Sequence, residues 1–368
     1  MFRFITTRLG RYLFVQTLVS IGLSLAAVAA AVLLVDVVEQ LRTVGARVQL
    51  SLPMAVYLTA LKAPQLLEQT LPFVILVGTM VALTRLNRRS ELVAIRASGV
   101  SAWRFLAPAG AAAFLIGVVA STAINPLASA LYEQYETQVA RLTGGEAMKV
   151  SSTGIWLRQG TKAQQVVIHA QSVDTNMGSL RAPAFMFFDV MKDGSLRFDR
   201  RMSADRADLK EGFWQLINVR EAHPGAPVAV YQQLALPTTL KASALFDRFV
   251  NPASLSFWRL PGYISQAKAA GVAPVRYELA WDSLVAAPLF LMAMAAFGAV
   301  FSLRLQRLGG VAQLAGMGVA VGFGLYFLSR MIAAFAEAEL TPPLLAAWAA
   351  PIAGFFSAMA VLSYLEDG

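Results

Sequence analysis

Long apolar runs occupy both ends of the chain, and a more polar stretch between residues 131 and 275 separates them. A helix that spans a bilayer needs about 20 mostly apolar residues. Three runs of that length precede the polar stretch and three follow it, at residues 12–35, 64–86, 105–131, 277–303, 309–332 and 342–365. The pattern predicts six membrane-spanning helices, three on each side of a large insert.

The first apolar run follows Arg3, Arg8 and Arg11, and a secretory signal peptide also begins with basic residues. The apolar region of a signal peptide is about 7 to 15 residues long and ends at a cleavage site of small residues. The run at 12–35 is longer, and no such site follows it. We therefore expect a span that is retained in the protein.

The insert has the pattern of β-structure. Short runs rich in β-branched and aromatic residues are separated by turn signals such as Lys192-Asp193-Gly194, and apolar and polar residues alternate within 228–236 as in a half-buried strand. Many short strands at this spacing predict an antiparallel sandwich or barrel, which the pattern does not distinguish. Residues 255–270 predict one or two short helices that lead back to the membrane. The expected strands cover residues 154–158, 165–168, 185–190, 196–202, 213–219 and 228–236.

Composition and charge agree with a membrane protein. Hydrophobic residues make up 57% of the 368 positions and charged residues 14%, whereas a soluble domain has about a quarter of its residues charged. The chain has no cysteine, which excludes disulfides and thiolate metal sites. The insert holds 16 basic and 12 acidic residues, so most of the net charge of +9 lies in the short segments around the spans. We take this surplus as a topology signal and expect no nucleic-acid partner.

Basic residues in the short loops predict the orientation. Five arginines lie within 85–104, around the loop between the second and third runs, where Glu91 is the single acid, and Arg304 and Arg307 follow the fourth run. Lysine and arginine in short loops mark the cytoplasmic side of a membrane protein. We therefore expect both termini in the cytoplasm and the insert on the outer side, although the acidic C-terminal end adds no support.

Motifs for catalysis are absent from the sequence. It contains no G-x-x-x-x-G-K-[ST] phosphate loop, no H-E-x-x-H and no G-x-S-x-G. The two histidines, His169 and His223, lie far apart in the insert, so we expect no metal site. We predict that the chain is not an enzyme and that it carries no catalytic residue. A membrane enzyme that uses only carboxylates remains an alternative.

The loop at 88–101 contains a short helix-forming segment. Leu92, Ala94 and Ile95 lie on one side of it, and Gly99 suits the left-handed end of a helix. One interpretation is a helix parallel to the membrane that docks into a partner. The other is an ordinary basic loop that contacts lipid phosphates.

Residues 89–101 resemble the coupling helix of the lipopolysaccharide-export permease family, which pairs two related polypeptides of F type and G type. Segments 154–158, 251–264 and 276–289 resemble, in order, the first strand, the return segment and the fourth span of that family. Residues 38–42 resemble the G type more than the F type. The resemblance covers nearly the whole chain and implies a six-helix membrane protein with an inserted periplasmic β-jellyroll. Its parts would be spans one to three at 1–130 with a coupling helix at about 87–99, the jellyroll domain at 131–275, and spans four to six at 276–368.

The resemblance implies one half of a permease that extracts lipopolysaccharide from the outer leaflet of the bacterial inner membrane. The lipid would pass through the cavity between the two halves, then through the jellyroll to a periplasmic bridge. The implied partners are a cytoplasmic ATPase dimer that binds the ATP, the F-type sister polypeptide and a C-type polypeptide with a single span; the chain itself would need no cofactor. An F-type identity, another transporter of similar build and a membrane anchor that only displays a β domain remain alternatives.

For the coupling helix, the resemblance implies that Glu91 pairs with a basic residue of the ATPase. An internal pair with Arg88, one helical turn away, is the alternative. Leu92, Ile95 and Ala97 would supply apolar contacts, and Gly99 would end the helix.

For the lipid, Arg42, Arg47 and Lys62 at the outer span ends would bind lipid A phosphates. Simple extension of these side chains to the headgroups is the alternative. Asp36 stands where family members often have a basic residue, which weakens this role for span one.

Aromatic side chains of spans two and five would form an apolar wall for acyl chains, or would face ordinary lipid. The candidates are Phe73, Phe323, Tyr326, Phe327 and Phe335. Gly318 and Gly322, spaced G-x-x-x-G, predict a close helix contact, either at a gate between spans one and five or between spans of the same chain.

Overall fold

The structure is a computed structural model with two compact units. The helical unit comprises Met1–Glu136, Pro252–Ser265 and Pro274–Gly368, and the β unit comprises Thr137–Asn251 and Gln266–Ala273. Each unit is described by itself. The described residues are 7–46, 48–142, 155–160, 164–174, 179–191, 196–210, 212–225, 227–238, 251–269, 274–308 and 311–367.

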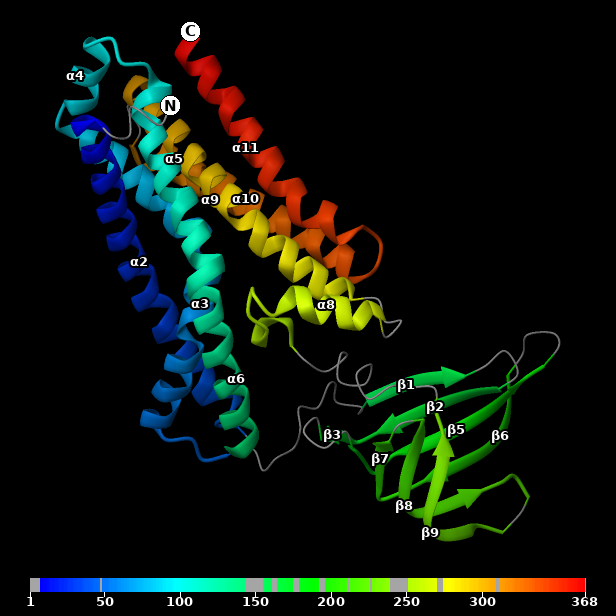
Figure 1. The fold of residues 1–368 in the computed structure, drawn as a ribbon. Helices are drawn as coiled ribbons and strands as arrows, with labels where there is room; N and C mark the ends of the chain where they lie inside the picture. Colours follow the sequence, from blue (N-terminus) through cyan, green and yellow to red (C-terminus); the bar gives the residue numbers. More distant parts are fainter. Residues whose placement is uncertain are drawn as a thin grey trace. The chain divides into compact units, whose positions relative to one another are not determined.

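Six helices of the described residues are long and apolar enough to cross a membrane, which confirms the predicted spans. They run side by side in the helical unit (Figure 1). The third span consists of α5, one π-helical turn and α6 in continuous succession. The helical elements are α2 (Arg8–Thr43), α3 (Leu52–Arg88), α4 (Glu91–Ala97), α5 (Ala102–Val119), η1 (Ala120–Ile124), α6 (Asn125–Leu142), η2 (Pro252–Ser254), α8 (Leu260–Ala269), α9 (Val275–Leu308), α10 (Val311–Glu337) and α11 (Pro343–Asp367).

Helix α3 packs closely between α2 and α10. A Cβ atom added at Gly78 would lie 2.7 Å from the Cα of Ile21 on α2, and one added at Gly322 of α10 would lie 3.1 Å from the side chain of Leu76. Residues 76 and 78 of a helix point in nearly opposite directions, so these contacts lie on opposite sides of α3. Gly298 of α9 approaches the backbone of α3 as well, since its added Cβ would lie 2.7 Å from the carbonyl oxygen of Leu76. Small residues permit such contacts between membrane helices.

Two prolines create acceptors that tie helices together. Proline cannot donate a hydrogen bond to the carbonyl four residues earlier. Pro288 of α9 thereby frees the carbonyl of Leu284, which accepts a hydrogen bond from Ser121 Oγ at 2.7 Å. Similarly, Pro126 frees the carbonyl of Thr122, and the indole N–H of Trp258 donates to that oxygen at 3.0 Å. Both hydrogen bonds therefore involve the third span, one through Ser121 and the other through the carbonyl of Thr122.

The return segment at 252–265 packs with the helices, although the sequence placed it in an insert domain at 131–275. The backbone N–H of Phe257 donates to Asn125 Oδ1 at 2.8 Å, and its ring lies 4.4 Å from that of Trp281 on α9. These contacts to α6 and α9 are the physical reason for the shift in the boundary.

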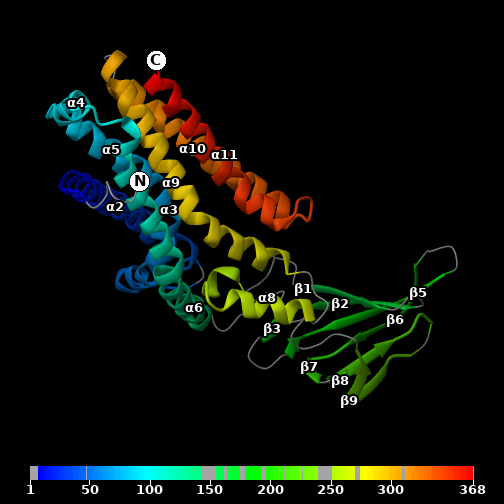
Figure 2. The same ribbon diagram turned by 45° about the horizontal axis from the view of Figure 1, so that its top comes forward.

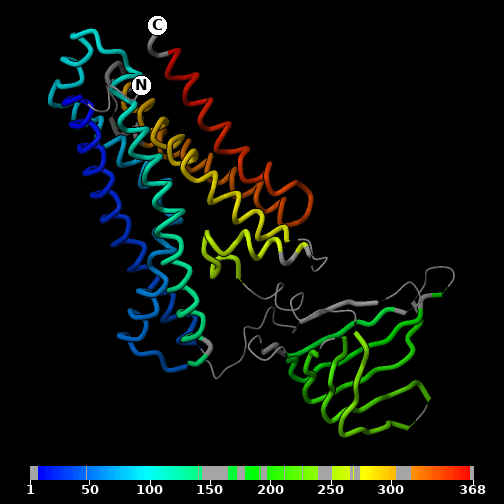
Figure 3. Tube along the Cα trace, in the orientation of Figure 1, coloured from blue at the N-terminus to red at the C-terminus, as the bar shows by residue number. Residues whose placement is uncertain are grey.

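The β unit is one antiparallel sheet in which strands that follow one another along the chain are mostly neighbours. The chain runs back and forth through it (Figures 2 and 3). This confirms the predicted fold class, a helical membrane protein with an inserted all-β domain. The strands are β1 (Ile155–Gly160), β2 (Gln164–Ala170), β3 (Ser172–Asp174), β4 (Ser179–Arg181), β5 (Ala184–Val190), β6 (Leu196–Ser203), β7 (Arg206–Lys210), β8 (Phe213–Ala222) and β9 (Ala229–Pro237).

A bend in the sheet divides β2 from β3 and β4 from β5, which would otherwise be continuous strands. His169 of β2 pairs with Ala184 of β5, and Ser172 of β3 pairs with Arg181 of β4, so the pairing register is the same on both sides of the bend. Ala182, between β4 and β5, has a φ of 45°. The bends fold the sheet around a core that includes Trp214 and Phe185, whose ring centroids lie 6.1 Å apart. A pattern search for straight strands misses β3, β4 and β7 for this reason.

Strand β9 differs from its predicted half-buried pattern. Val228 and Val230 are exposed, and burial begins only toward Leu234 and Leu236. Among the described strands, β9 pairs with β8 alone, so its first residues lie on an edge that no described strand covers.

The contact between α2 and α3 predicts a stability difference between two glycine substitutions. Gly78→Val places a side chain against the Ile21 backbone, and overpacking of this kind costs about 1–3 kcal/mol. Gly324→Val on α10 is the control, because an added Cβ there meets nothing within 4 Å. Thermal unfolding of the detergent-solubilised chain should show a lower midpoint for Gly78→Val only. Equal midpoints for the two variants would contradict the close α2–α3 contact.

Candidate functional site

Helix α4 forms a separate short helix between α3 and α5. Ser90, with φ of 60°, makes the turn from α3 into α4, and Gly99, with φ of 80°, lies just past the end of α4. The sequence placed the helix at about 87–99, but Arg88 belongs to the last turn of α3. Helix α4 lies at the end of the helical unit where α2 begins and α11 ends (Figures 1 and 3).

The two faces of α4 have different environments. Leu92 and Ile95 are 1% and 9% exposed and belong to the same apolar core as Phe105. Val93 is 56% exposed, and Ala97 is exposed as well. In this chain the side chains of Leu92 and Ile95 attach α4 to the bundle, and their contact with a partner stays a prediction. The face left free carries Val93, which the sequence interpretation missed.

Glu91 contacts groups within the chain. The hydroxyl of Tyr12 on α2 donates to Glu91 Oε2 at 2.9 Å, and Arg89 lies 3.9 Å from Oε1. The internal pair with Arg88 is not formed, because the turn at Ser90 separates the two helices. Glu91 thus links α4 to the start of the first span.

A buried polar cluster joins the ends of α2, α3 and α6 that lie away from α4. Asp36 is 7% exposed and accepts from Lys62 Nζ at 2.8 Å, from Thr59 Oγ1 at 2.9 Å and from Gln40 Nε2 at 3.3 Å. The hydroxyl of Tyr135 donates to Gln40 Oε1 at 3.2 Å. We call these five residues the Asp36 cluster. It explains why α2 and α3 extend beyond their apolar runs, since the polar side chains there satisfy one another.

The Asp36 cluster changes the interpretation of Lys62. Its ammonium group already has a carboxylate partner inside the protein. Arg42, in contrast, lies exposed in the last turn of α2. Arg47 lies outside the described residues.

Three of the expected aromatic residues come together where α10 meets α3. The Phe73 ring lies 4.9 Å from that of Tyr326 and 6.1 Å from that of Phe323. Arg330, one turn further along α10, donates from Nε to the Tyr326 hydroxyl at 3.1 Å. We call these four residues the aromatic cluster. Phe327 and Phe335 lie exposed on α10 outside it.

Arg330 is a candidate that the sequence interpretation missed. It is an exposed charged residue within a membrane-spanning helix. Charged residues at such positions are rare and commonly functional, so a search for charges within the apolar runs would have found it.

Gly318 and Gly322 lie at a contact between two spans of the same chain. Added Cβ atoms would meet the side chains of Met80 and Leu76 on α3 at 3.1 Å. Within this chain Gly322 therefore packs α10 on the second span, and the Cβ added at Gly318 would also lie 3.1 Å from the side chain of Phe301 on α9. The gate between spans one and five stays a prediction.

Two spans are left largely uncovered by the chain. In the most apolar segments of α2 and α10, 11% of the residues are buried, against 56–61% in the second, third and fourth spans. Helix α2 packs on α3 and α5, and α10 packs on α9, α11 and α3. The remaining face of each helix is available to lipid or to another polypeptide.

Comparison with known proteins decides the family. The profile of the family described as "Lipopolysaccharide export system permease LptF/LptG" matches residues 11–364.

The chain belongs to the LptF/LptG permease family.

Relatives within the LptF/LptG family include the Lipopolysaccharide export system permease protein LptG of Escherichia coli K12, which is 23% identical over 330 residues, 88% of each chain. The LptG protein of Haemophilus influenzae is 25% identical over 309 residues, 81% of this chain and 82% of that one. The resemblance to the G type that residues 38–42 indicated agrees with these matches. The chain is thus similar to permease components of lipopolysaccharide export over nearly its whole length.

The ion pair in the Asp36 cluster predicts non-additive stability effects. Asp36→Ala leaves the ammonium of Lys62 without its counter-charge and should lower the free energy of unfolding by up to about 3 kcal/mol, because Lys62 is only 25% exposed. The double variant Asp36→Ala/Lys62→Ala should cost less than the two single variants together. Denaturant unfolding in detergent measures the three values, and additive costs would contradict a functioning pair.

Because one face of α4 is buried and the other is exposed, alanine substitution should lower stability strongly on the first face and little on the second. Leu92→Ala removes a fully buried side chain and should lower the free energy of unfolding by about 2–5 kcal/mol. Val93→Ala, its immediate neighbour, should change it by less than about 0.5 kcal/mol. A larger loss of thermal stability for Val93→Ala than for Leu92→Ala would show that the assignment of the two faces is reversed.

Proposed function

We propose that this chain is the LptG-type half of an ATP-driven lipopolysaccharide exporter in the bacterial inner membrane. The observation that carries the proposal is the pair of spans α2 and α10, whose most apolar segments are the least buried of the six spans. A second, related polypeptide of LptF type would face these spans, and the space between the two halves would admit the lipid. Both termini and α4 would lie in the cytoplasm, and the β unit in the periplasm.

The exposed face of α4 would dock into a cytoplasmic ATPase dimer that binds the ATP. Val93 and Ala97 offer the apolar contact, while Leu92 and Ile95 hold the helix to the bundle. The hydrogen bond from Tyr12 to Glu91 would pass a displacement of α4 directly to α2. In this proposal Glu91 acts within the chain, because its carboxylate already holds a partner.

The aromatic cluster would contact the lipid. Phe73, Phe323 and Tyr326 offer apolar surface for acyl chains, and Arg330 offers a guanidinium suited to a phosphate of lipid A. Arg330 lies seven residues before Glu337, so it sits about 10 Å inside the end of α10. Arg330 and Arg42 are better candidates than Lys62, since Asp36 neutralises Lys62.

Later steps would use the β unit. Extracted lipid would pass along its sheet to a periplasmic bridge, and a polypeptide of C type with a single span would associate with the permease. Support for these steps comes from family membership and from the inserted antiparallel sheet.

ATP-dependent release of lipopolysaccharide tests the proposed function. Vesicles that hold this chain, its LptF-type sister and the ATPase should release labelled lipopolysaccharide to a soluble acceptor only with ATP. Val93→Asp should abolish both association with the ATPase and release, because it places a charge in the apolar contact. Val230→Asp, at an exposed position of β9, is the matched control for association. Release without ATP, or unchanged association of Val93→Asp, would contradict the proposal.

A further inference from the structure

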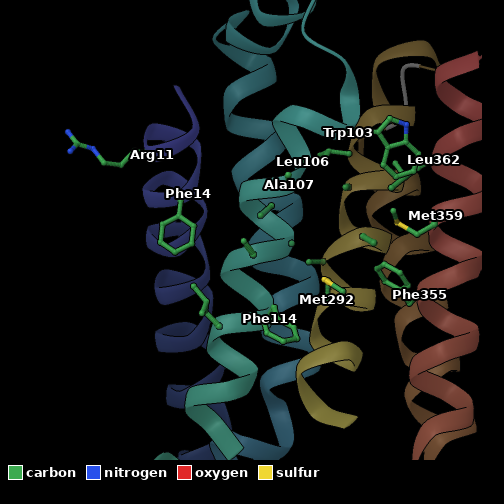
Figure 4. Close-up of a pocket in the computed structure, with 17 residues that line it drawn as sticks. Arg11, Phe14, Trp103, Leu106, Ala107, Phe114, Met292, Phe355, Met359 and Leu362 are labelled. Carbon is green, nitrogen blue, oxygen red and sulfur yellow. The ribbon is translucent and has the colours of Figure 1, made fainter. Parts of the chain in front are cut away.

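An apolar cavity lies within the helical unit, away from the aromatic cluster. It has a volume of about 560 Å³, within the usual range of about 300–1,000 Å³ for ligand sites. Four spans surround it (Figure 4), and it shares no residue with the aromatic cluster.

The lining of this cavity combines small and aromatic residues. Ala107 and Gly110 of α5 and Ala296 of α9 leave the space open, and Phe114 and Phe355 lie at its sides. An added Cβ at Gly110 would come no closer than 3.8 Å to Met292, so the space at this glycine is real. The hollow results from short side chains on facing helices.

The length of the cavity corresponds to one leaflet of a bilayer. Its lining on α5 extends from Trp103 to Leu115, twelve residues or about 18 Å along a helix. The hydrocarbon core of a bilayer is about 30 Å thick, so one leaflet contributes about 15 Å. Trp103 lies in the first turn of α5, so the cavity begins at the end of the unit where α4 lies. Its position and depth match the acyl chains of that leaflet.

Arginine side chains lie at the same end of the helical unit. Arg11 is the charged residue among the described lining residues, and its guanidinium points away from the apolar lining (Figure 4). Arg8 on α2 and Arg104 on α5 are exposed in the first turns of their helices. Arginine side chains in this position extend to headgroup phosphates while their stems contact apolar surface. The arrangement of an apolar hollow below cationic groups complements a phospholipid.

We propose that this cavity binds an acyl chain of one glycerophospholipid, whose phosphate lies near Arg11. The site is separate from the proposed lipopolysaccharide path and lies next to the connection between α4 and α5. The side chains that line an empty cavity would lack dispersion contacts on one side. In a bilayer, lipid acyl chains are the molecules that can make these contacts. The leaflet is the cytoplasmic one if α4 lies in the cytoplasm, and only this point rests on the proposed function.

Native mass spectrometry of the full chain tests the proposal. The protein is stripped of lipid in detergent and titrated with palmitoyl-oleoyl-phosphatidylglycerol. The wild-type chain should retain one phospholipid in a saturable way. Gly110→Leu fills the cavity and should lose that adduct, whereas Gly22→Leu on α2, where an added Cβ meets nothing within 4 Å, should keep it. Retention by Gly110→Leu, or no saturable binding to the wild type, overturns the proposal.

A second measurement avoids dependence on the folding of Gly110→Leu. Dibrominated phosphatidylglycerol quenches nearby tryptophan, and Trp103 lines the cavity. Saturable quenching at one lipid per chain should be present in the wild type and absent in Trp103→Phe; equal quenching in both overturns the proposal. Neither measurement uses ATP or a partner polypeptide. Failure of phospholipid binding can therefore be distinguished from failure of lipopolysaccharide export.

Discussion

Close packing around α3 is the constraint on which the helical unit depends. Apolar side chains gain little from leaving lipid for a helix interface, so membrane helices associate through van der Waals contact and hydrogen bonds. Gly78 and Gly298 bring α2 and α9 so close to α3 that an added Cβ would lie 2.7 Å from a backbone atom, and Gly322 brings α10 into tight contact with Leu76. The prolines add hydrogen bonds of the same specificity, as between Ser121 and the carbonyl of Leu284. Helix α9 in turn contacts α5, α10 and α11, so α3 and α9 together position the other spans of the unit.

This arrangement leaves two spans exposed, and the proposed function rests on that exposure. Helix α2 packs on α3 and α5, helix α10 packs on α3, α9 and α11, and each presents its remaining face to the surroundings. The aromatic cluster lies beside one of these free faces, and the link from Tyr12 to Glu91 reaches the other. In the proposed function, these free faces of a permease of the LptF/LptG family would meet a second polypeptide. Helices packed on all sides would leave no path for a lipid.

Much of the fold followed from the sequence, because apolar length and strand patterns depend on local composition. The six spans and most strands were predictable in this way. Features that depend on contacts between residues far apart in the sequence were not predictable. Leu92 and Val93 are both apolar, and only the packing of α4 on the bundle decides that Leu92 is buried. The sequence alone does not show that Lys62 is paired, because its partner Asp36 lies 26 residues away along the chain. The bend between β4 and β5 similarly hides short strands from any search for straight ones.

The central claim is that the exposed face of α10 meets lipopolysaccharide during export. Photo-crosslinking from a benzoyl-phenylalanine tests it most directly, because the probe reports what touches one position in a native membrane. Phe327 on α10 is 61% exposed, and Phe356 on α11, at 66%, is a matched control. The account predicts lipopolysaccharide adducts at position 327 and none at position 356 in cells that are exporting the lipid. Equal adducts at both positions, or adducts at position 356 alone, would contradict it.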